Sequence, residues 1–300
     1  MNAERYLTAR ARLIEHALRR YVPPQRKHPR KLSEAMRYSL FSGGKRIRPI
    51  LLLAAAEAVG GERAAAMPFA CAVEMIHTYS LIHDDLPAMD DDVLRRGRPT
   101  NHLVFGDGIA ILAGDALLTD AFHIMAAELA HRTRGGRAAA ALKEIAEAAG
   151  SAGMVGGQAA DLEAEGAEPN LPVVEYIHVR KTGALLVACI RAGAILGSAR
   201  PNALRQLTRF GEFFGLAFQV ADDILDAEAG VAVTGKTPGR DRARRKLTFP
   251  AVLGLPAAKE RARGLLANAL AALDPLKAPA EPLRAIARYV VARGCDGRPA

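Results

Sequence analysis

Six aspartates in two tight clusters have the side chains and the spacing for metal chemistry. The first cluster contains Asp84, Asp85 and Asp90, and the second contains Asp222, Asp223 and Asp226. Carboxylates this close repel one another and raise one another's pKa unless a cation is present. Mg²⁺ takes oxygen ligands and commonly sits between carboxylates and the phosphates of a substrate. In a chain with 41 Lys and Arg residues, the clusters indicate a site where Mg²⁺, with Mn²⁺ as the alternative ion, and basic side chains bind a diphosphate together.

The second cluster lies along one stripe of a predicted helix. Gln219, Asp222, Asp223 and Asp226 fall at positions i, i+3, i+4 and i+7, which share one face of an α-helix. The surrounding positions are apolar: Phe210, Phe214, Leu216, Val220, Ile224 and Leu225. A solvent-exposed acidic stripe is the alternative interpretation. The apolar flanks argue against it, because acidic groups on a mostly buried helix need partners or a metal.

The first cluster follows another apolar helix. His77, Ser80 and Asp84 share one face of that helix, and Pro87 should loosen it just past the Asp pair. The chain could then turn Asp90 back towards Asp84. The two predicted acidic helices have the same form, so we expect them to face each other with their acidic ends at one mouth.

Arginine and lysine residues accompany both clusters. Arg95 and Arg96 follow the first cluster and could bind a metal-bridged phosphate, although residues 90–98 could also form an exposed salt-bridged turn. Lys181 and Thr182 precede an apolar run and could place a cation and a hydroxyl at a pocket rim, although such a pair is usually on the surface.

Two glycine-rich basic segments are candidates for anion binding. Gly44, Lys45 and Arg48 open an apolar helix, where backbone N–H groups and the basic side chains could hold an anion. The alternative is an ordinary basic loop. Lys236 and Lys246 lie in a second Gly-rich, basic stretch that could close over phosphate or simply form a solvated turn.

Composition and periodicity predict an all-α fold. Half of the 300 residues are hydrophobic, Ala and Leu dominate, and Trp is absent. Helical periodicity recurs from end to end, broken by short Gly and Pro segments, and no long linker divides the chain. We therefore expect one domain over residues 1–300, made of roughly ten helices.

Charge and cysteine usage limit the possible binding partners and the cellular compartment of the protein. The formal net charge of +9 attracts anions, but few aromatics and no recognition motif argue against nucleic acid. Cys71, Cys189 and Cys295 have no zinc or disulfide spacing, which favours a reducing compartment. The N-terminus lacks an apolar signal core, and the apolar stretches 49–59 and 184–198 are too short to span a bilayer. We expect a cytoplasmic protein without integral membrane association.

Taken together, these motifs resemble the trans-isoprenyl diphosphate synthases, most closely the bacterial farnesyl diphosphate synthases. The resemblance runs over nearly the whole chain, and two ordered Asp motifs with the basic opening motif are highly specific in combination. The segments that carry it are residues 43–49, 76–92, 94–97, 112–118, 157–162, 181–183, 218–226, 235–237 and 246–250.

The resemblance implies a helical fold around a deep central cavity, a homodimer, and a reaction. An allylic diphosphate ionises, isopentenyl diphosphate attacks the cation, and a proton is lost. It implies that the six aspartates hold Mg²⁺ ions on the allylic diphosphate. The implied ligands of isopentenyl diphosphate are Gly44, Lys45, Arg48, His77 and Arg96. The implied ligands of the allylic diphosphate are Arg95, Lys181, Lys236 and Lys246. Thr182 and Gln219 resemble residues beside the developing cation, and with Lys181 they form the predicted catalytic group.

Product length is predicted from the helix that carries Asp84. Tyr79 lies five residues before Asp84, about 7.5 Å lower at ~1.5 Å per residue, where an aromatic ring can act as a floor. Ser80 is small and leaves room above that floor. The resemblance therefore implies a C15 product, farnesyl diphosphate.

Other functions remain as alternatives. The nearest is a geranylgeranyl or longer-chain synthase. A non-catalytic partner subunit usually loses Asp motifs, and both are intact here. A terpene cyclase would share an Asp-rich motif but have no use for a second diphosphate site at Lys45 and Arg48. The sequence departs from the family pattern in residues 226–234, which lack the acidic residue often found just before Gly235 and Lys236, and at Phe249, where Tyr is frequent.

Overall fold

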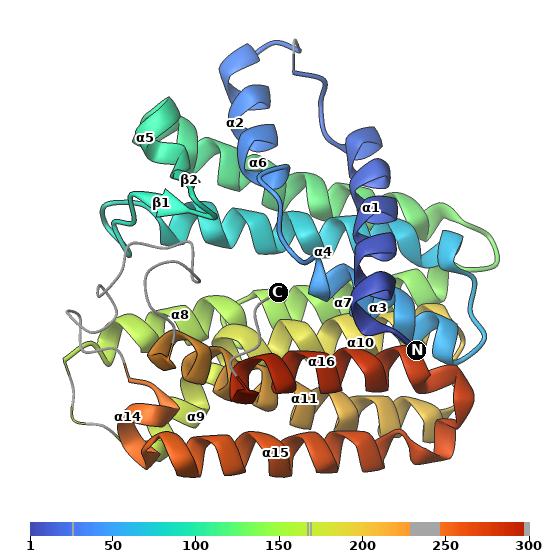
Figure 1. The fold of residues 1–300 in the computed structure, drawn as a ribbon. Coiled ribbons are helices and arrows are strands. Elements are labelled where there is room, and N and C mark those ends of the chain that lie inside the picture. The colour runs from blue at the N-terminus through green and yellow to red at the C-terminus, as the bar shows by residue number, and fades with distance from the viewer. Residues whose placement is uncertain (26, 167, 169, 229–246, 297–300) are drawn as a thin grey trace.

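An apolar helix, α4 (Arg63–Asp84), runs through the middle of the fold and ends at the first acidic motif. Ala and Leu, which favour helix, dominate this segment and its neighbours. Helix α4 packs against α3 (Ile47–Ala58) and α6 (Asp107–Ala127), and α10 (Ala184–Leu196) packs on α3. Figure 1 shows an upper group that includes α2, α5 and α6 and a lower group that includes α11, α15 and α16.

The computed structural model describes residues 1–25, 27–166, 168, 170–228 and 247–296. The remaining helices of these residues are α1 (Ala3–Tyr21), α2 (Arg30–Leu40), α5 (Asn101–Phe105), α7 (Gly135–Ala149), α8 (Met154–Glu163), α9 (Leu171–His178), α11 (Pro201–Glu228), α14 (Phe249–Leu253), α15 (Leu255–Ala272) and α16 (Glu281–Asp296). Short 3₁₀ segments span Glu128–Ala130, Asp274–Leu276 and Ala278–Ala280, and Val179–Gly183 forms a π-helical segment, η2.

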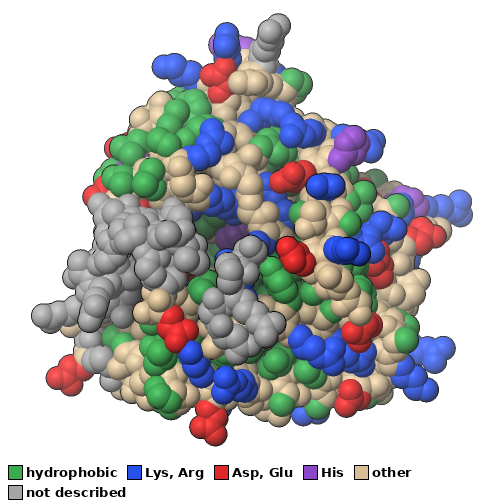
Figure 2. Space-filling view, in the orientation of Figure 1, with side chains coloured by type: hydrophobic (Ala, Val, Ile, Leu, Met, Phe, Trp, Pro, Cys, Tyr) green, Lys and Arg blue, Asp and Glu red, His purple; other side chains and the backbone are tan. Residues whose placement is uncertain are grey.

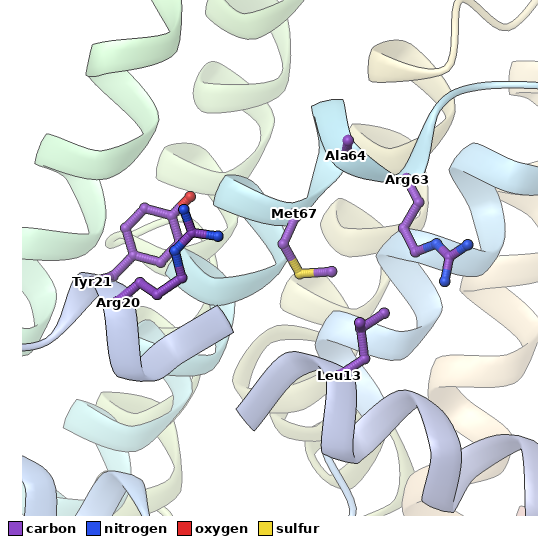
Figure 3. A pocket seen from close by; sticks show the side chains of 6 residues that line it. All are labelled: Leu13, Arg20, Tyr21, Arg63, Ala64 and Met67. Atoms are coloured by element: carbon purple, nitrogen blue, oxygen red, sulfur yellow. The ribbon is translucent and has the colours of Figure 1, made fainter. Parts of the chain in front are cut away.

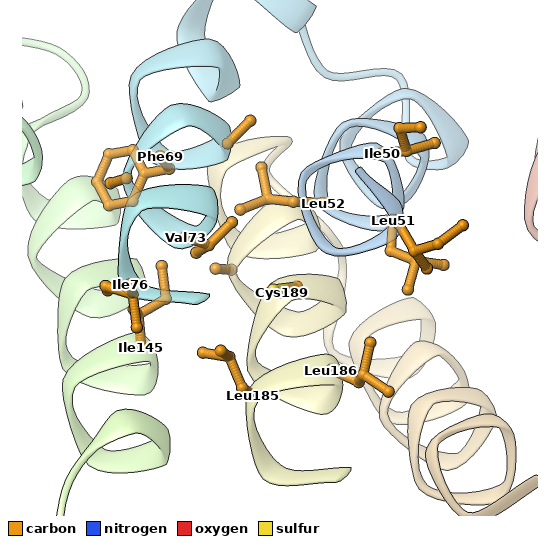
Figure 4. Close-up of a cluster of buried hydrophobic side chains, with 14 of the residues drawn as sticks. Ile50, Leu51, Leu52, Phe69, Val73, Ile76, Ile145, Leu185, Leu186 and Cys189 are labelled. Carbon is orange, nitrogen blue, oxygen red and sulfur yellow. The ribbon is translucent and has the colours of Figure 1, made fainter. Parts of the chain in front are cut away.

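Interdigitated side chains from four helices form the core beside the site. Figure 4 shows side chains of this cluster between the helices, among them Leu52 of α3, Phe69 and Val73 of α4, Ile145 of α7 and Leu185 of α10. All five are fully buried. A second cluster joins α11 to α14 and α15 and includes Val220, Ile224 and Phe249. These two cores fix the ends of α4 and α11, which carry the acidic motifs.

The all-α prediction is confirmed, and the described residues form fourteen α-helices where roughly ten were expected. The excess includes short helices such as α5 and α14, which are five residues each and give little periodic signal. One small hairpin was not expected: β1 (Leu94–Arg95) pairs antiparallel with β2 (Arg98–Pro99). Its two turn residues, Arg96 and Gly97, have φ of 54° and 73°, as a type I′ turn requires.

Two described helical stretches are long and apolar enough to cross a membrane by length and composition alone. They are Arg63–Asp84 and Asp107–Ala130. Both are longer than the stretches 49–59 and 184–198 that were considered from the sequence. The first is the core helix α4, with 78% of its most apolar window buried. The second buries only 39% of that window, so α6 presents an apolar surface outside its own chain's core.

Candidate active site

The first acidic motif lies where α4 ends and the chain folds back. Asp85 caps the helix, and the Asp90 N–H donates to the Asp84 carbonyl at 2.7 Å. The Asp91 N–H donates to the Leu86 carbonyl at 3.0 Å, with a φ of 46° at Asp91. The turn that follows Pro87 thus returns Asp90 to Asp84, as its position in the sequence predicts.

A guanidinium group lies within the first acidic motif. The Arg95 Nε donates to Asp85 Oδ1 at 2.9 Å, Nη2 donates to the same oxygen, and Nη2 lies 3.3 Å from Asp92 Oδ2. Burial raises the pKa of Asp85 to about 6 against the opposing effect of Arg95. Burial also raises the pKa of Asp84 to about 6, against the charge of Lys181, and Asp90 adds to the rise. This group of carboxylates therefore favours an additional cation.

Lys181 and Thr182 lie on the π-helical segment η2, between the two acidic motifs. The Lys181 Nζ donates to Asp161 Oδ2 of α8 at 2.6 Å, and Thr182 is buried. Helix α8 approaches closely because Gly157 has no side chain: a Cβ there would lie 2.2 Å from the Lys181 backbone nitrogen. The positive charge of Lys181 acts to lower the pKa of Asp84 on α4, and η2 packs on α11.

The second acidic motif lies on an uninterrupted helix, α11. Asp222 and Asp226 are exposed and Asp223 is half-buried, so the predicted stripe lies along one side of a helix whose other side is core. The His178 Nε2 lies 3.2 Å from Asp223 Oδ2, and the Phe249 N–H donates to the same oxygen at 2.9 Å. Gln219 is also held by His178, through its Nε2 at 3.0 Å from the imidazole Nδ1.

The predicted anion site at the start of α3 gathers a histidine and two arginines. Arg48 Nη1 lies 3.2 Å from His77 Nε2. Burial, with the charges of Arg48 and Arg96, lowers the pKa of His77 well below its usual value, so His77 is neutral at pH 7. Arg96 donates to the Gly43 carbonyl, and a Cβ at Gly44 would lie 2.6 Å from the Arg96 guanidinium carbon. Glycine at 44, with a φ of 119°, therefore makes room for Arg96.

Lys45 connects this basic site to α11. Partial withdrawal from water and the charge of Arg293 lower the pKa of Lys45, and Asp222 opposes them. Asp222 likewise opposes the lowering of the Arg48 pKa by burial. Both acidic motifs therefore share an environment with the predicted basic residues. Figure 2 shows a recess on this face of the molecule with His and Lys or Arg side chains inside it.

Three neighbouring residues were not identified from the sequence. Arg46 is fully buried and bonds to Glu74 Oε1 at 2.7 Å, Glu15 and the Leu40 carbonyl, so it belongs to the core although it stands between Lys45 and Arg48. Asp161 pairs with Lys181, and His178 contacts Gln219 and Asp223. Asp161 lies in the segment 157–162, which carries part of the family resemblance, so its position was a signal. Nothing in the sequence indicated that its partner is Lys181.

Lys236 and Lys246 lie outside the described residues. Among the residues that are described, no group of three or more His, Cys, Asp or Glu side chains is arranged to hold a metal alone. A pocket of about 520 Å³ lies elsewhere, between α1 and the start of α4, lined by Leu13, Arg20, Tyr21, Arg63, Ala64 and Met67 (Figure 3). It is at the opposite end of α4 from Asp84 and contains no predicted site residue.

Comparison with known proteins gives one family. Residues 29–280 match the polyprenyl synthetase family. A farnesyl diphosphate synthase of Geobacillus stearothermophilus is 49% identical over 87% of this chain and 88% of that protein. The large subunit 1 of a heterodimeric chloroplast geranylgeranyl pyrophosphate synthase of Arabidopsis thaliana is 48% identical over 96% of this chain and 78% of that protein. The crystal structure of an FPP/GFPP synthase from Zymomonas mobilis superposes with a TM-score of 0.86 at 40% identity, covering 97% of this chain and 99% of that one.

Proposed function

Because this chain belongs to the polyprenyl synthetase family, we propose that it joins isopentenyl diphosphate to dimethylallyl or geranyl diphosphate and releases farnesyl diphosphate. The family makes it a prenyltransferase of isoprenoid biosynthesis; the individual residue roles and the C15 product are the proposal. The observation that carries the reaction is the position of Lys181, whose charge reaches Asp84 while its segment packs against the helix of Asp222 and Asp223.

Ionisation of the allylic substrate breaks its C–O bond and leaves the electron pair on diphosphate. Arg95 and Lys181, with Lys236 and Lys246 from outside the described residues, would hold that leaving group. Cationic side chains accelerate this step because they stabilise negative charge as it develops. Thr182 and Gln219 would supply oxygen dipoles beside the allylic cation. Thr182 follows Lys181 on η2, and Gln219 lies on α11, the helix that packs against η2.

Isopentenyl diphosphate would be held by Arg48, His77, Arg96, Lys45 and the backbone at Gly44. Arg48 supplies charge, and neutral His77 supplies hydrogen bonds rather than a second charge. The double bond attacks the cation and forms the new C–C bond. The proton lost afterwards would pass to the released diphosphate, an oxygen base already in the site.

The acidic residues fit a divalent cation. Burial raises the pKa of Asp84 and Asp85 to about 6, so a cation is favoured beside them, and both offer the hard oxygen ligands that Mg²⁺ or Mn²⁺ takes. Mg²⁺ usually keeps several waters and binds through one or two carboxylates plus substrate phosphates, so phosphate oxygens and water would complete its coordination. When bound through the six aspartates of the two motifs, Mg²⁺ would neutralise charge on the departing diphosphate.

We propose a homodimer that covers the apolar face of α5 and α6. Leu103, Val104, Ile111 and Leu112 are exposed there, with Leu112 at 53% exposure, and Figure 2 shows an apolar patch over this region. A patch of this kind marks an interaction site, and a second copy can cover it through a twofold axis. The Arabidopsis relative is described as a subunit of a heterodimer. A monomer in sedimentation velocity would remove this part of the proposal.

The same proposal places the enzyme in the cytoplasm without integral membrane association. Cys71, Cys189 and Cys295 are free and buried, as in a reducing compartment. The exposed apolar side of α6 is assigned to the second copy rather than to lipid.

Tyr79 is the reason for a C15 product. Its side chain is buried on α4 below Asp84 and packs edge-on against His83 with ring centroids 5.6 Å apart. An aromatic ring held by this contact would stop the growing chain, with Ser80 leaving space above it. A geranylgeranyl synthase is the second candidate, because a chloroplast relative of that name is 48% identical.

Product analysis by chain length distinguishes these candidates. With isopentenyl and geranyl diphosphates and Mg²⁺, we expect mainly C15, and no product once a chelator removes the ion. Tyr79→Ala should shift the main product to C20 or longer at a similar total rate. Tyr176→Ala, which changes an exposed ring, is the matched control and should leave the products unchanged. A C20 main product from the wild type would reject the C15 assignment in favour of the second candidate.

A further inference from the structure

His178, the last residue of α9, lies between two proposed site residues of α11. Its Nδ1 is 3.0 Å from Gln219 Nε2, and its Nε2 is 3.2 Å from Asp223 Oδ2. One face of the imidazole stacks on Phe249, with centroids 5.3 Å apart and planes 14° apart. The residue is 8% exposed, so two hydrogen bonds and one stacking contact fix the ring orientation.

Glycine contacts bring these residues together. Gly215, Gln219 and Asp223 are spaced at i, i+4 and i+8 and therefore share one face of α11. At Gly215 a Cβ would lie 3.3 Å from Gly183 Cα, so the absence of a side chain lets α11 approach η2 closely. The next two turns of α11 then meet His178, which directly precedes η2.

The hydrogen-bond partners determine where the imidazole carries its proton. An amide nitrogen can only donate, so Nδ1 of His178 must accept from Gln219. Nε2 faces the Asp223 carboxylate, which can only accept, so Nε2 carries a proton and donates it to Asp223. With the opposite orientation of the Gln219 amide, its oxygen would face Nδ1, and the ring would have to carry a proton on both nitrogens.

We propose that His178 is a positioning residue that turns the side-chain carbonyl of Gln219 towards the reacting allylic carbon. The inference rests on the proposed function, in which Gln219 lies beside the developing cation. Among the described residues none donates to Gln219 Oε1, so that oxygen keeps its lone pairs for the cation. A dipole oriented before the reaction stabilises charge without reorganising during it.

Kinetics of three variants tests whether His178 acts through Gln219. His178→Phe keeps a ring that can stack on Phe249 but removes both hydrogen bonds. We expect it to lower the single-turnover rate of diphosphate release by about 10²-fold, with KM for isopentenyl diphosphate changed by less than about twofold. Gln219→Leu should have a similar effect, and the double variant should be no slower than Gln219→Leu alone.

Two kinetic results would overturn the inference. One is an unchanged rate in His178→Phe while Gln219→Leu is slow. The other is a double variant whose loss is the product of the two single losses, because independent effects multiply. Phe249→Leu is the control for packing: it removes the stack and leaves the backbone donor to Asp223 in place. A rate loss in this control as large as in His178→Phe would assign the effect to packing and reject the proposal.

A measurement without turnover tests the same hydrogen bonds. In the metal-free wild type with ¹⁵N-labelled histidine, we expect the His178 signals of a ring protonated on Nε2 and unprotonated on Nδ1. The signals are assigned with His178→Phe or His178→Gln, whichever keeps the helical circular dichroism spectrum. A proton on Nδ1 would overturn the inference even with normal catalysis. A wild type that makes no prenyl diphosphate would instead reject the proposed function, which keeps the two failures distinct.

Discussion

The two acidic motifs share an Asp-Asp pair but differ in how the protein compensates their charge. On α4 the pair ends a helix, the chain folds back, and Arg95 donates to Asp85. On α11 the pair lies inside a helix, and a histidine donates to Asp223. The first motif therefore lies in a turn beside Arg95, whereas Asp222 and Asp226 of the second lie at a more exposed surface.

This difference shows that equal spacing in the sequence does not give equal electrostatics. The α4 carboxylates are buried enough for their pKa to rise to about 6 despite Arg95 and Lys181. Asp222 and Asp226 on α11 are exposed, and water can approach them. We expect the α4 motif to be the more sensitive to substitution, to charge and to pH.

The largest expected effect is on turnover. Asp84→Ala should lower kcat by about 10³-fold or more, because the proposal makes this half-buried carboxylate a ligand of the metal on the reacting diphosphate. Asp226→Ala should lower it by only about 10-fold, because water can replace an exposed ligand. Steady-state rates at saturating Mg²⁺ measure both, with circular dichroism to verify the fold. An equal or larger loss for Asp226→Ala would reverse the proposed ranking of the motifs.

An intermediate effect is expected on metal affinity. Arg95→Gln removes the cation that competes for Asp85, so the Kd for Mn²⁺ without substrate should fall by about 10-fold. Arg98→Gln makes the same charge change on the same hairpin, but Arg98 lies over the Tyr38 ring at 4.2 Å and should leave Mn²⁺ affinity unchanged. Calorimetric titration measures both. Weaker Mn²⁺ binding in Arg95→Gln would mean that Arg95 orders the carboxylates rather than competing with the ion.

The smallest expected effect is on stability. Because the folded pKa of Asp84 is raised to about 6, its protonation stabilises the metal-free fold at low pH, and this contribution is lost as pH rises through about 6. Asp84→Asn should therefore raise the melting temperature at pH 7.5, by about 2–4 °C for each kcal/mol, and raise it by only about half as much at pH 5, between the unfolded and folded pKa values. Thermal melts at both pH values give the difference. A larger gain at pH 5 would contradict the raised pKa.

Local patterns in the sequence were sufficient for much of the site. Pro87 predicted the end of α4 and the return of Asp90, because a proline ring restricts the backbone around it. The i, i+3, i+4, i+7 spacing predicted the stripe on α11. Both predictions depend only on neighbours within one or two turns.

Long-range pairs were beyond the reach of the same reasoning. His178 meets Asp223 across 45 residues, and Asp161 meets Lys181 across 20. Their meeting depends on how closely η2 approaches α8 and α11, which tertiary packing decides. Arg46 shows the same limit, because a run of basic residues does not reveal which one turns into the core.

The hairpin of Arg95 and Arg96 connects the proposed sites of the two diphosphates. Arg95 is the last residue of β1 and Arg96 is the first residue of the turn. The Arg95 guanidinium reaches Asp85, and the Arg96 guanidinium reaches the Gly43 carbonyl. A single residue inserted into or deleted from this tight turn would change the geometry that places Arg96 directly after Arg95. The length of this turn is thus constrained from both sides at once, because a change in it would disturb both proposed diphosphate sites.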